Sequence, residues 1–232
     1  MKQLTLDLTP HAVPSFASFV TGTNAELIAA LTVFASGGGA ERFIYLWGEP
    51  GSGRSHLLAA VVALAASMNR KALLLQAPLS TDALDHVDAE ALLALDDIER
   101  LDPASQRSLF GLYNRMRASS GALITSGPLA PTGLRVRADL ATRLAWGLVF
   151  QARALTDADK ALAMRERAAA HGFKLPQDVC DYVLRHGQRD LPSLIALVDM
   201  LDRHSLETHR AVTLPLVRAV MRLTTEHMRS TQ

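Results

Sequence analysis

The sequence has little of the chemistry that marks secreted or metal-binding proteins. Its single cysteine, Cys180, cannot form a disulfide within the chain, and it falls in an apolar helical pattern that favours a packed thiol over a reactive one. The histidines are scattered, and His204 and His209 stand five residues apart, one too many for a pair of zinc ligands on one helical face. We therefore expect no metal site beyond Mg²⁺ that arrives with a nucleotide.

The chain also lacks a long apolar run, a secretion signal and a strong net charge. Its longest apolar run, residues 57–66, is about half the length that a membrane span needs. The N-terminus does not show the basic-then-apolar order of a signal peptide. A net charge of +1 gives no overall attraction to nucleic acid, although local basic patches are left open. With 49% hydrophobic and 20% charged residues, the chain is predicted to be a soluble, cytoplasmic globular protein.

A glycine-rich stretch at residues 48–55 is the strongest motif present. It reads G-E-P-G-S-G-R-S, the phosphate-binding pattern G-x-x-x-x-G-K-[ST] with Arg54 in place of lysine. An apolar strand-like run, residues 43–47, precedes it, and a helix-favouring run follows, so backbone N–H groups and a helix N-terminus would face a phosphate. The alternative is an ordinary glycine-rich turn. The residues expected to bind nucleotide here are Gly48, Gly51, Ser52, Gly53, Arg54, Ser55 and His56, with the Ser55 hydroxyl also reaching Mg²⁺.

Arg54 qualifies the chemistry expected of that loop. A guanidinium stays charged and can hold phosphate oxygens with two donors, so binding of ATP or ADP should survive the substitution. It is planar and bulkier than the lysine amine, so it cannot sit in the same way between two phosphates. We therefore expect weak intrinsic ATPase activity at most.

Two adjacent carboxylates, Asp96 and Asp97, provide the second half of a predicted nucleotide site. They directly follow an apolar strand, residues 91–95, about 40 residues after the glycine loop. Asp96 is expected to reach Mg²⁺ and Asp97 to orient the attacking water, whereas the alternative is a simple acidic turn. Thr125 and Ser126 end the next strand, so they should lie near the terminal phosphate.

Alternation of strands and helices predicts an α/β fold with a mainly parallel five-stranded sheet covered by helices. The expected strands are residues 43–47, 72–75, 91–95, 122–125 and 148–151, and the wholly apolar run 72–75 is expected to be a buried strand. From Thr156 onward only helical patterns follow, beginning with a capping box that uses Asp159. This predicts a base domain at residues 14–154 and a small all-helical domain at residues 155–232.

The N-terminal segment is divided into two short parts. In residues 1–13, Leu4, Leu6 and Leu8 alternate with polar residues, which fits either a peptide that docks on another protein or an edge strand of this domain. Residues 14–24 carry Phe19 and Val20, which would suit either a cover over an adenine ring or core filling.

Taken together, these residues resemble the AAA+ family and, within it, the DnaA/Hda family. The similarity covers nearly the whole chain. It is carried by the glycine loop, by the segments 3–8 (Q-L-T-L-D-L) and 16–19 (F-A-S-F), and by residues 45–47 and 139–147 (D-L-A-T-R-L-A-W-G). Segment 3–8 is similar to that family's sliding-clamp peptide, with Asp7 in place of its proline.

The resemblance implies a function and further site residues. It implies a negative regulator of DNA replication initiation that is nucleotide-bound and tethered to the DNA-loaded clamp (the β subunit of DNA polymerase III). Such a protein stimulates hydrolysis of DnaA-bound ATP, giving inactive ADP–DnaA. It assigns Arg143 as an arginine finger acting in trans and Arg189 as a nucleotide contact from the helical lid; without it, both read as surface charges. The residues assigned to clamp binding are Gln3, Leu4, Leu6 and Leu8.

An autonomous P-loop enzyme is the competing hypothesis. A helicase-loader-like ATPase would need an efficient cycle of its own, against which Arg54 argues, and a nucleotide kinase would want further arginines near the loop. The sequence ends at Gln232 without a basic recognition helix, so we expect no sequence-specific DNA binding. Self-association into a homo-oligomer is compatible with the resemblance.

Overall fold

The structure is a computed structural model that describes residues 14–208 and 212–229, with side chains described at 14–205 and 212–221. The chain divides into two compact units, residues 1–154 and 155–232. Each unit has a hydrophobic core of its own.

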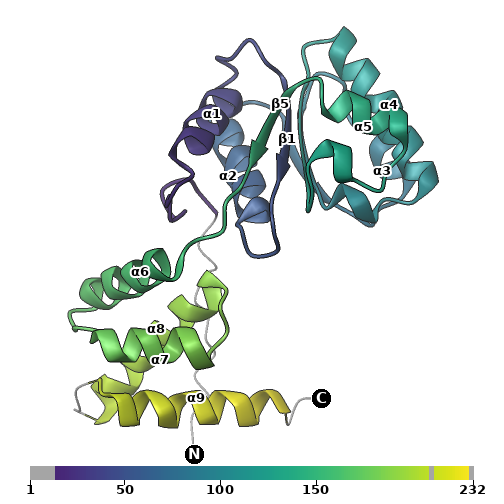
Figure 1. The fold of residues 1–232 in the computed structure, drawn as a ribbon. Coiled ribbons are helices and arrows are strands. Elements are labelled where there is room, and N and C mark those ends of the chain that lie inside the picture. The colour runs from purple at the N-terminus through teal and green to yellow at the C-terminus, as the bar shows by residue number, and fades with distance from the viewer. Residues whose placement is uncertain (1–13, 209–211, 230–232) are drawn as a thin grey trace, which may run out of the picture. The chain divides into compact units, whose positions relative to one another are not determined.

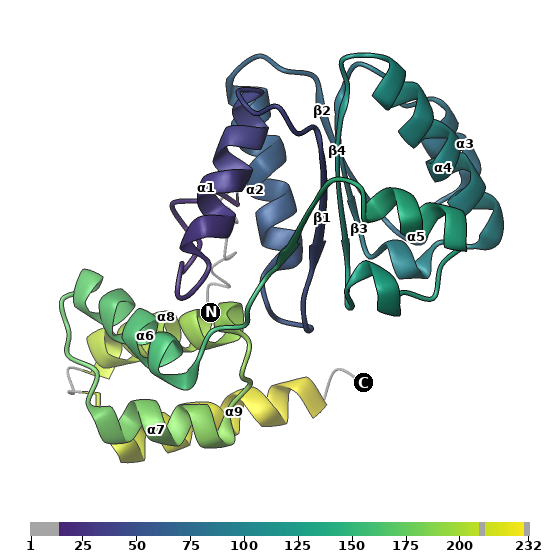
Figure 2. The same cartoon turned by 45° about the horizontal axis from the view of Figure 1, so that its top comes forward.

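A five-stranded parallel sheet forms the centre of the first unit. Its strands are β1 (Phe43–Trp47), β2 (Ala72–Gln76), β3 (Leu92–Asp96), β4 (Ala122–Gly127) and β5 (Leu148–Gln151). They lie side by side in the order β2-β3-β4-β1-β5, and every pairing is parallel. Figure 2 shows the sheet between the helices on its two sides. The loop after β1 and the acids after β3 therefore emerge at the same, carboxyl edge of the sheet. The predicted fold class is confirmed.

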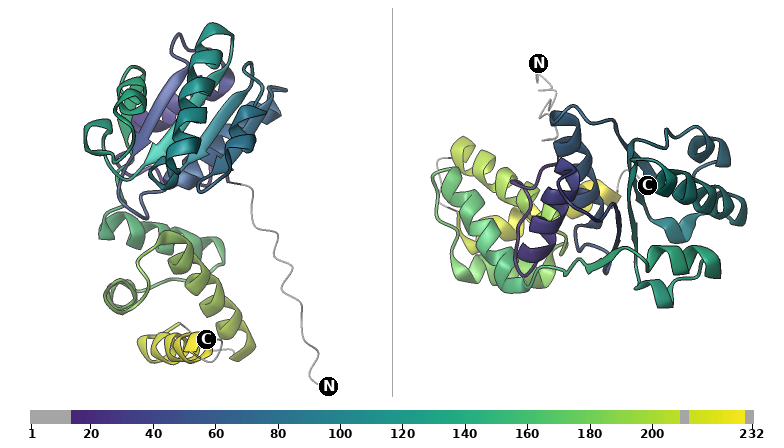
Figure 3. Two further views of the ribbon diagram at one scale, coloured as in Figure 1. Left: turned by 90° about the vertical axis from the view of Figure 1, so that its right-hand side faces the viewer. Right: turned by 90° about the horizontal axis from the view of Figure 1, so that it is seen from above.

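Helices cover both faces of this sheet (Figure 1). On one face, α1 (Ala25–Ser36) and α2 (Arg54–Ser67) pack on side chains that include Ile44, Leu46 and Ile124. The other face carries α4 (Pro103–Ala118), packed on side chains that include Tyr45 and Leu123. The left view of Figure 3 looks onto this second face, with the strands behind the helices. Because both faces are covered, the inner strands are continuously apolar.

Short helices fill the connections, and the sequence patterns did not predict them. They are α3 (Thr81–Asp85), α5 (Ala138–Leu144) and the 3₁₀ turns η1 (Ile98–Arg100) and η2 (Pro131–Gly133). One strand prediction was also wrong in detail. Residues 72–75 were expected to be buried, but β2 is an edge strand on which Leu73 and Leu74 are 42% and 44% exposed.

The second unit is built from four helices among the residues described: α6 (Asp157–Ala170), α7 (Gln177–His186), α8 (Leu191–Thr208) and α9 (Leu214–Arg229). The predicted capping box opens α6, since the Thr156 hydroxyl accepts from the backbone N–H of Asp159 and the Asp159 carboxylate accepts in return. Cys180 is fully buried in this core, and burial raises the pKa of its thiol, as expected for a packed, inert cysteine. Within the described part of the chain, none of the helices combines the length and apolarity needed to cross a membrane.

Candidate functional site

The glycine loop is held in a conformation that strongly favours glycine. Gly51 and Gly53 have φ of 81° and 89°, in the left-handed region, and Gly53 directly precedes the first turn of α2. A Cβ on Gly48 would lie 2.3 Å from the carbonyl oxygen of Ala152, so the loop passes close to the backbone that follows β5. These constraints fix a tight turn that leads from the end of β1 directly into the N-terminus of α2.

Two side chains of the loop carry buried polar atoms without a hydrogen-bond partner: the Ser52 hydroxyl and Nη1 of Arg54. Such atoms are costly unless something outside the chain satisfies them. A hydroxyl and a guanidinium beside a helix N-terminus form a donor set suited to phosphate oxygens. The residues present therefore fit a bound nucleotide. Ser55, at the second position of α2, is exposed, so its hydroxyl is free to face a bound cation.

Asp96 ends β3 as a buried carboxylate, only 3% exposed. Its Oδ1 accepts hydrogen bonds from the Ser126 hydroxyl and from the backbone N–H of Asp97. Ser126 lies at the end of the adjacent strand β4, so the two predicted strand ends do meet. A carboxylate fixed by two donors at this edge is a suitable ligand for Mg²⁺ that arrives with nucleotide.

Asp97 lies between two arginines. Its carboxylate is 3.6 Å from Nη2 of Arg54 and 3.7 Å from Nη1 of Arg100. The Gln76 side-chain amide donates to Asp97 at 3.3 Å. Asp97 itself has φ of 56°, a strained value for a residue with a side chain, and such strain persists where the surroundings impose it. Asp97 is thus oriented and already paired with cations of the chain.

Glu99 adds a third acid close to Asp97, and the sequence patterns did not single it out. Burial raises the pKa of its carboxyl, and the neighbouring Asp97 raises it further while Arg54 lowers it. Its Oε2 is buried without a hydrogen-bond partner. The only sequence signal was its place three residues after Asp96, in a turn, and acidic residues are common in surface turns whatever their function.

The aromatic segment before α1 contacts the glycine loop. A Cβ added to Gly53 would lie 2.6 Å from the Phe19 ring, and the Phe19 ring centroid is 5.7 Å from that of His56. His56 Nε2 is 2.9 Å from the carbonyl oxygen of Ser15 and 3.3 Å from the Ser18 hydroxyl. Val20, next to Phe19, is half-buried. Phe19 also packs on the core, as the core-filling alternative predicted, and its role as a cover over an adenine ring stays a prediction.

Thr125 is not among the groups that meet Asp96. Its hydroxyl is buried without a hydrogen-bond partner, and its side chain lines a small void together with Tyr113, Arg143 and Leu144. Side chains alternate along a strand, so Thr125 lies on the opposite sheet face from Ser126. Of the two polar residues expected near the terminal phosphate, Ser126 is the one that contacts the acidic pair.

Arg143 lies in the last turn of α5 among aromatic rings. Its guanidinium carbon is 3.9 Å from the ring centroid of Trp146, 5.5 Å from that of Phe110 and 6.0 Å from that of Tyr113. Nη1 is buried without a hydrogen-bond partner. Among the described residues, none of the ion pairs involves Arg143, so no carboxylate there neutralises its positive charge.

The remaining predicted residues lie elsewhere. Arg189, in the second unit, pairs with Asp157 at 2.5 Å on an exposed surface. Gln3, Leu4, Leu6 and Leu8 lie outside the described residues.

Comparison with known proteins bears on both units. Residues 157–221 match the family described as "Hda, lid domain". Domain III of the replication initiation protein DnaA from Thermotoga maritima has the same fold, with a TM-score of 0.72 at 17% identity over 91% of this chain and 96% of that one. The chain therefore has the AAA+ fold of DnaA domain III, and its second unit matches the lid domain of the Hda family. The resemblance stated from the sequence is confirmed.

Two further structures share this AAA+ fold. AMPPCP-bound DnaA from Aquifex aeolicus matches with a TM-score of 0.69 at 19% identity, over 84% of this chain and 67% of that one. The RuvB Holliday-junction branch-migration motor from Thermotoga maritima matches with a TM-score of 0.69 at 14% identity, over 90% and 72%. At such identities the likeness establishes the fold, and the match to the Hda lid family concerns residues 157–221.

Proposed function

We propose that this protein binds ADP or ATP and stimulates hydrolysis of ATP held by DnaA, leaving inactive ADP–DnaA and so restraining replication initiation. The relation to Hda and DnaA supports a role in replication. The observation that carries the finer proposal is Arg143, a cation with a buried donor and no carboxylate partner among the described residues. Such a group is suited to receive an anion brought by another molecule.

Nucleotide binding in this proposal rests on the glycine loop. The phosphates would be held by the unsatisfied donors of Ser52 and Arg54 and by the N-terminus of α2. The turn at Gly48, Gly51 and Gly53 would let the backbone approach them. Ser55 and Asp96 would hold Mg²⁺, whose charge would offset that of the phosphates. AMPPCP binding by the DnaA relative supports this assignment. Phe19 and Val20 would cover the base, and Arg189 would approach from the lid.

Arg143 would act on a nucleotide that belongs to the partner. Negative charge builds on the oxygens around the transferring phosphoryl group, and a guanidinium placed there stabilises the transition state selectively. Asp97 is less suited to support efficient turnover in the chain's own site, because Arg54 and Arg100 already pair with its carboxylate. This pairing weighs against the autonomous helicase-loader-like ATPase.

The clamp completes the proposal as a tether. Residues 3–8 would dock in an apolar pocket of the sliding clamp, with Gln3 hydrogen-bonding and Leu4, Leu6 and Leu8 buried, and the DNA-loaded clamp would raise the local concentration of this protein near DnaA.

The decisive experiment measures hydrolysis of labelled ATP pre-bound to DnaA, with this protein added in the presence or absence of DNA-loaded clamp. We expect rapid conversion to ADP only when protein and clamp are both present, and loss of the clamp effect when residues 1–8 are deleted. Turnover of free ATP by this protein alone, with no effect on DnaA-bound ATP, would instead support the loader-like enzyme.

A further inference from the structure

Trp146 is exposed, yet its backbone is fixed on both sides. Its N–H donates to the carbonyl oxygen of Arg143 at 3.1 Å, which closes a tight turn at the end of α5. The next residue, Gly147, passes so close to β1 that a Cβ there would lie 2.1 Å from the carbonyl oxygen of Phe43. The backbone of Trp146, a residue that is 53% exposed, is thus fixed close to that of Arg143.

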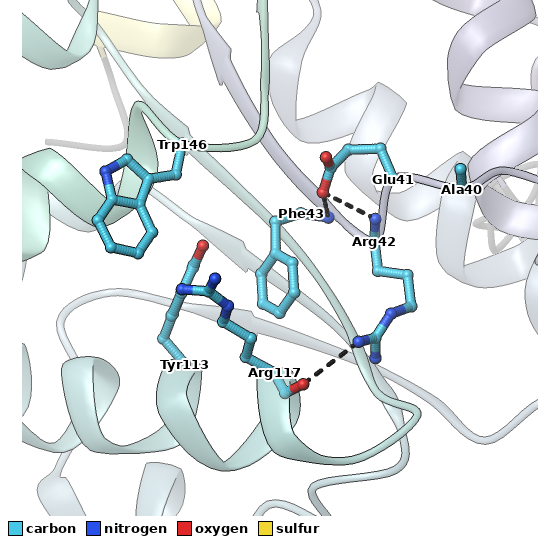
Figure 4. A pocket seen from close by; sticks show the side chains of 7 residues that line it. All are labelled: Ala40, Glu41, Arg42, Phe43, Tyr113, Arg117 and Trp146. Atoms are coloured by element: carbon cyan, nitrogen blue, oxygen red, sulfur yellow. Dashed lines mark hydrogen bonds between the residues drawn. The ribbon is translucent and has the colours of Figure 1, made fainter.

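The indole ring is the nearest aromatic contact of the Arg143 guanidinium. The distance of 3.9 Å corresponds to direct stacking, whereas Phe110 and Tyr113 lie near the outer limit of about 6 Å for cation–π attraction. The same indole also has Arg117 at 5.0 Å. Figure 4 shows Trp146 and Arg117 lining a pocket of about 410 Å³ with Phe43 and Tyr113.

Stacking orients an arginine differently from an ion pair. A carboxylate would occupy N–H donors and neutralise the charge, as Asp139 does for Arg137 through hydrogen bonds of 2.7 and 3.1 Å. An aromatic face instead restrains the guanidinium plane and leaves its five N–H donors unused. Arg143 is held by aromatic stacking, whereas Arg137, six residues earlier, is held by an ion pair.

We infer that Trp146 is the positioning residue for Arg143: its indole presents the guanidinium, with its donors free, to a phosphoryl group bound by another protein. This inference rests on the proposed function. It assigns to Trp146 no contact with the nucleotide itself. Its effect should therefore fall on the rate of the chemical step and leave the affinity between the two proteins unchanged.

The test is single-turnover hydrolysis of DnaA-bound ATP with DNA-loaded clamp, measured over a range of concentrations of this protein. Trp146→Leu should lower the maximal rate about 2- to 5-fold, as expected for the loss of one cation–π contact on an exposed ring, and leave the half-maximal concentration unchanged. Trp146→Phe should retain most of the rate, because a smaller aromatic face remains. The controls are Phe110→Leu, which removes a more distant ring, and Arg137→Ala, which removes an arginine that a carboxylate already holds; both should stay near the wild-type rate.

A spectroscopic measurement tests the contact without any partner. The chain has two tryptophans, Trp47 and Trp146, so the emission of Trp146 is the difference between wild type and Trp146→Phe. Arg143→Ala should change this emission, and Arg137→Ala should leave it unchanged. No change with Arg143→Ala would overturn the stacking.

The kinetic outcomes separate this inference from the proposed function. If Arg143→Ala stimulates hydrolysis as well as wild type, the proposed function fails. If Arg143→Ala is inactive but Trp146→Leu keeps the wild-type rate, only the positioning role fails. A raised half-maximal concentration with an unchanged maximal rate would make Trp146 a docking contact and would likewise overturn the inference. Circular dichroism and ADP binding identify any variant that has lost its fold, and Trp146→Phe then carries the test.

Discussion

Nη2 of Arg54 lies 3.6 Å from Oδ1 of Asp97, so the arginine of the glycine loop faces the carboxylate that would orient an attacking water. The two side chains are only 12% and 17% exposed, which limits screening of the pair by solvent. The substitution of arginine for lysine thus affects more than phosphate binding. In the proposed site, the same guanidinium also contacts the carboxylate that would orient the water.

Arg54→Lys should therefore raise the slow intrinsic ATP turnover. A lysine amine is compact and flexible, so it need not stay beside the Asp97 carboxylate as the guanidinium does. Release of that carboxylate should raise the turnover rate roughly fivefold to tenfold. The measurement is phosphate release by the purified protein alone. Arg100→Lys is the matched control, because Arg100 faces the same carboxylate at 3.7 Å but is 55% exposed. Turnover that falls with Arg54→Lys would show that Arg54 supports the chemistry.

Gly53→Ala should disrupt the loop for two separable reasons. The φ of 89° strains any residue with a Cβ, by about 1–2 kcal/mol, and the new methyl would lie 2.6 Å from the Phe19 ring. We expect a lower thermal midpoint and loss of ADP binding by calorimetry. The double variant Gly53→Ala/Phe19→Ala removes the clash and keeps the strain. Full recovery of binding in that double variant would mean that the backbone conformation of Gly53 is dispensable.

In the second unit, a low pH should weaken the ion pairs that Asp199 makes with Arg167 and His171. Burial raises the pKa of its carboxyl, but hydrogen bonds from Arg167 at 2.7 Å and from His171 at 2.9 Å outweigh burial, and the net pKa lies below its ordinary value of 3.8. A carboxyl whose pKa is lowered by folding stabilises the folded state at pH values above its ordinary pKa. This stabilisation is lost as the pH falls through the pKa of the folded state.

Asp199→Asn should accordingly destabilise the second unit by roughly 1 kcal/mol at pH 7, with the difference from wild type shrinking below about pH 4. Denaturant unfolding followed at several pH values checks this. Arg165→Ala is a suitable control, since Arg165 lies on α6 together with Arg167, the partner of Asp199, but hydrogen-bonds the neutral Gln177 side chain. A difference that stays constant from pH 7 to pH 3 would contradict the assignment.

Local patterns were enough to predict the fold and the two strand ends that meet. Five apolar runs, the glycine loop and the acids after β3 define a parallel sheet whose carboxyl edge must bring Asp96 and the end of β4 together. They could not predict which of Thr125 and Ser126 contacts Asp96, because that depends on strand register. A shift of one residue exchanges the two faces.

Tertiary contacts account for what was missed. Arg143 read as a surface charge because nothing in its local sequence gives the distances to Phe110 and Tyr113, which come from α4. Trp146 stood out in the sequence only as part of a family motif, although an aromatic three residues after an arginine at a helix end was a usable signal. The exposed edge of β2 was missed for the same reason, since Leu73 and Leu74 look identical to core residues until the strand order is known.

Arg143→Ala is the sharpest test of the proposed chemistry. Arginine fingers contribute roughly 10³- to 10⁵-fold in rate, or about 4–7 kcal/mol of barrier, so hydrolysis of DnaA-bound ATP should fall toward its unstimulated rate. Folding and ADP binding should survive, because the glycine loop comes from a different part of the chain and Arg143 has no carboxylate partner among the described residues. Arg143→Lys should rescue poorly, since an amine lacks the planar fork and stacks less well on Trp146. Arg137→Ala, which removes an arginine of the same segment, should stimulate hydrolysis normally. Equal losses of stimulation in both variants would show that Arg143 contributes only its positive charge.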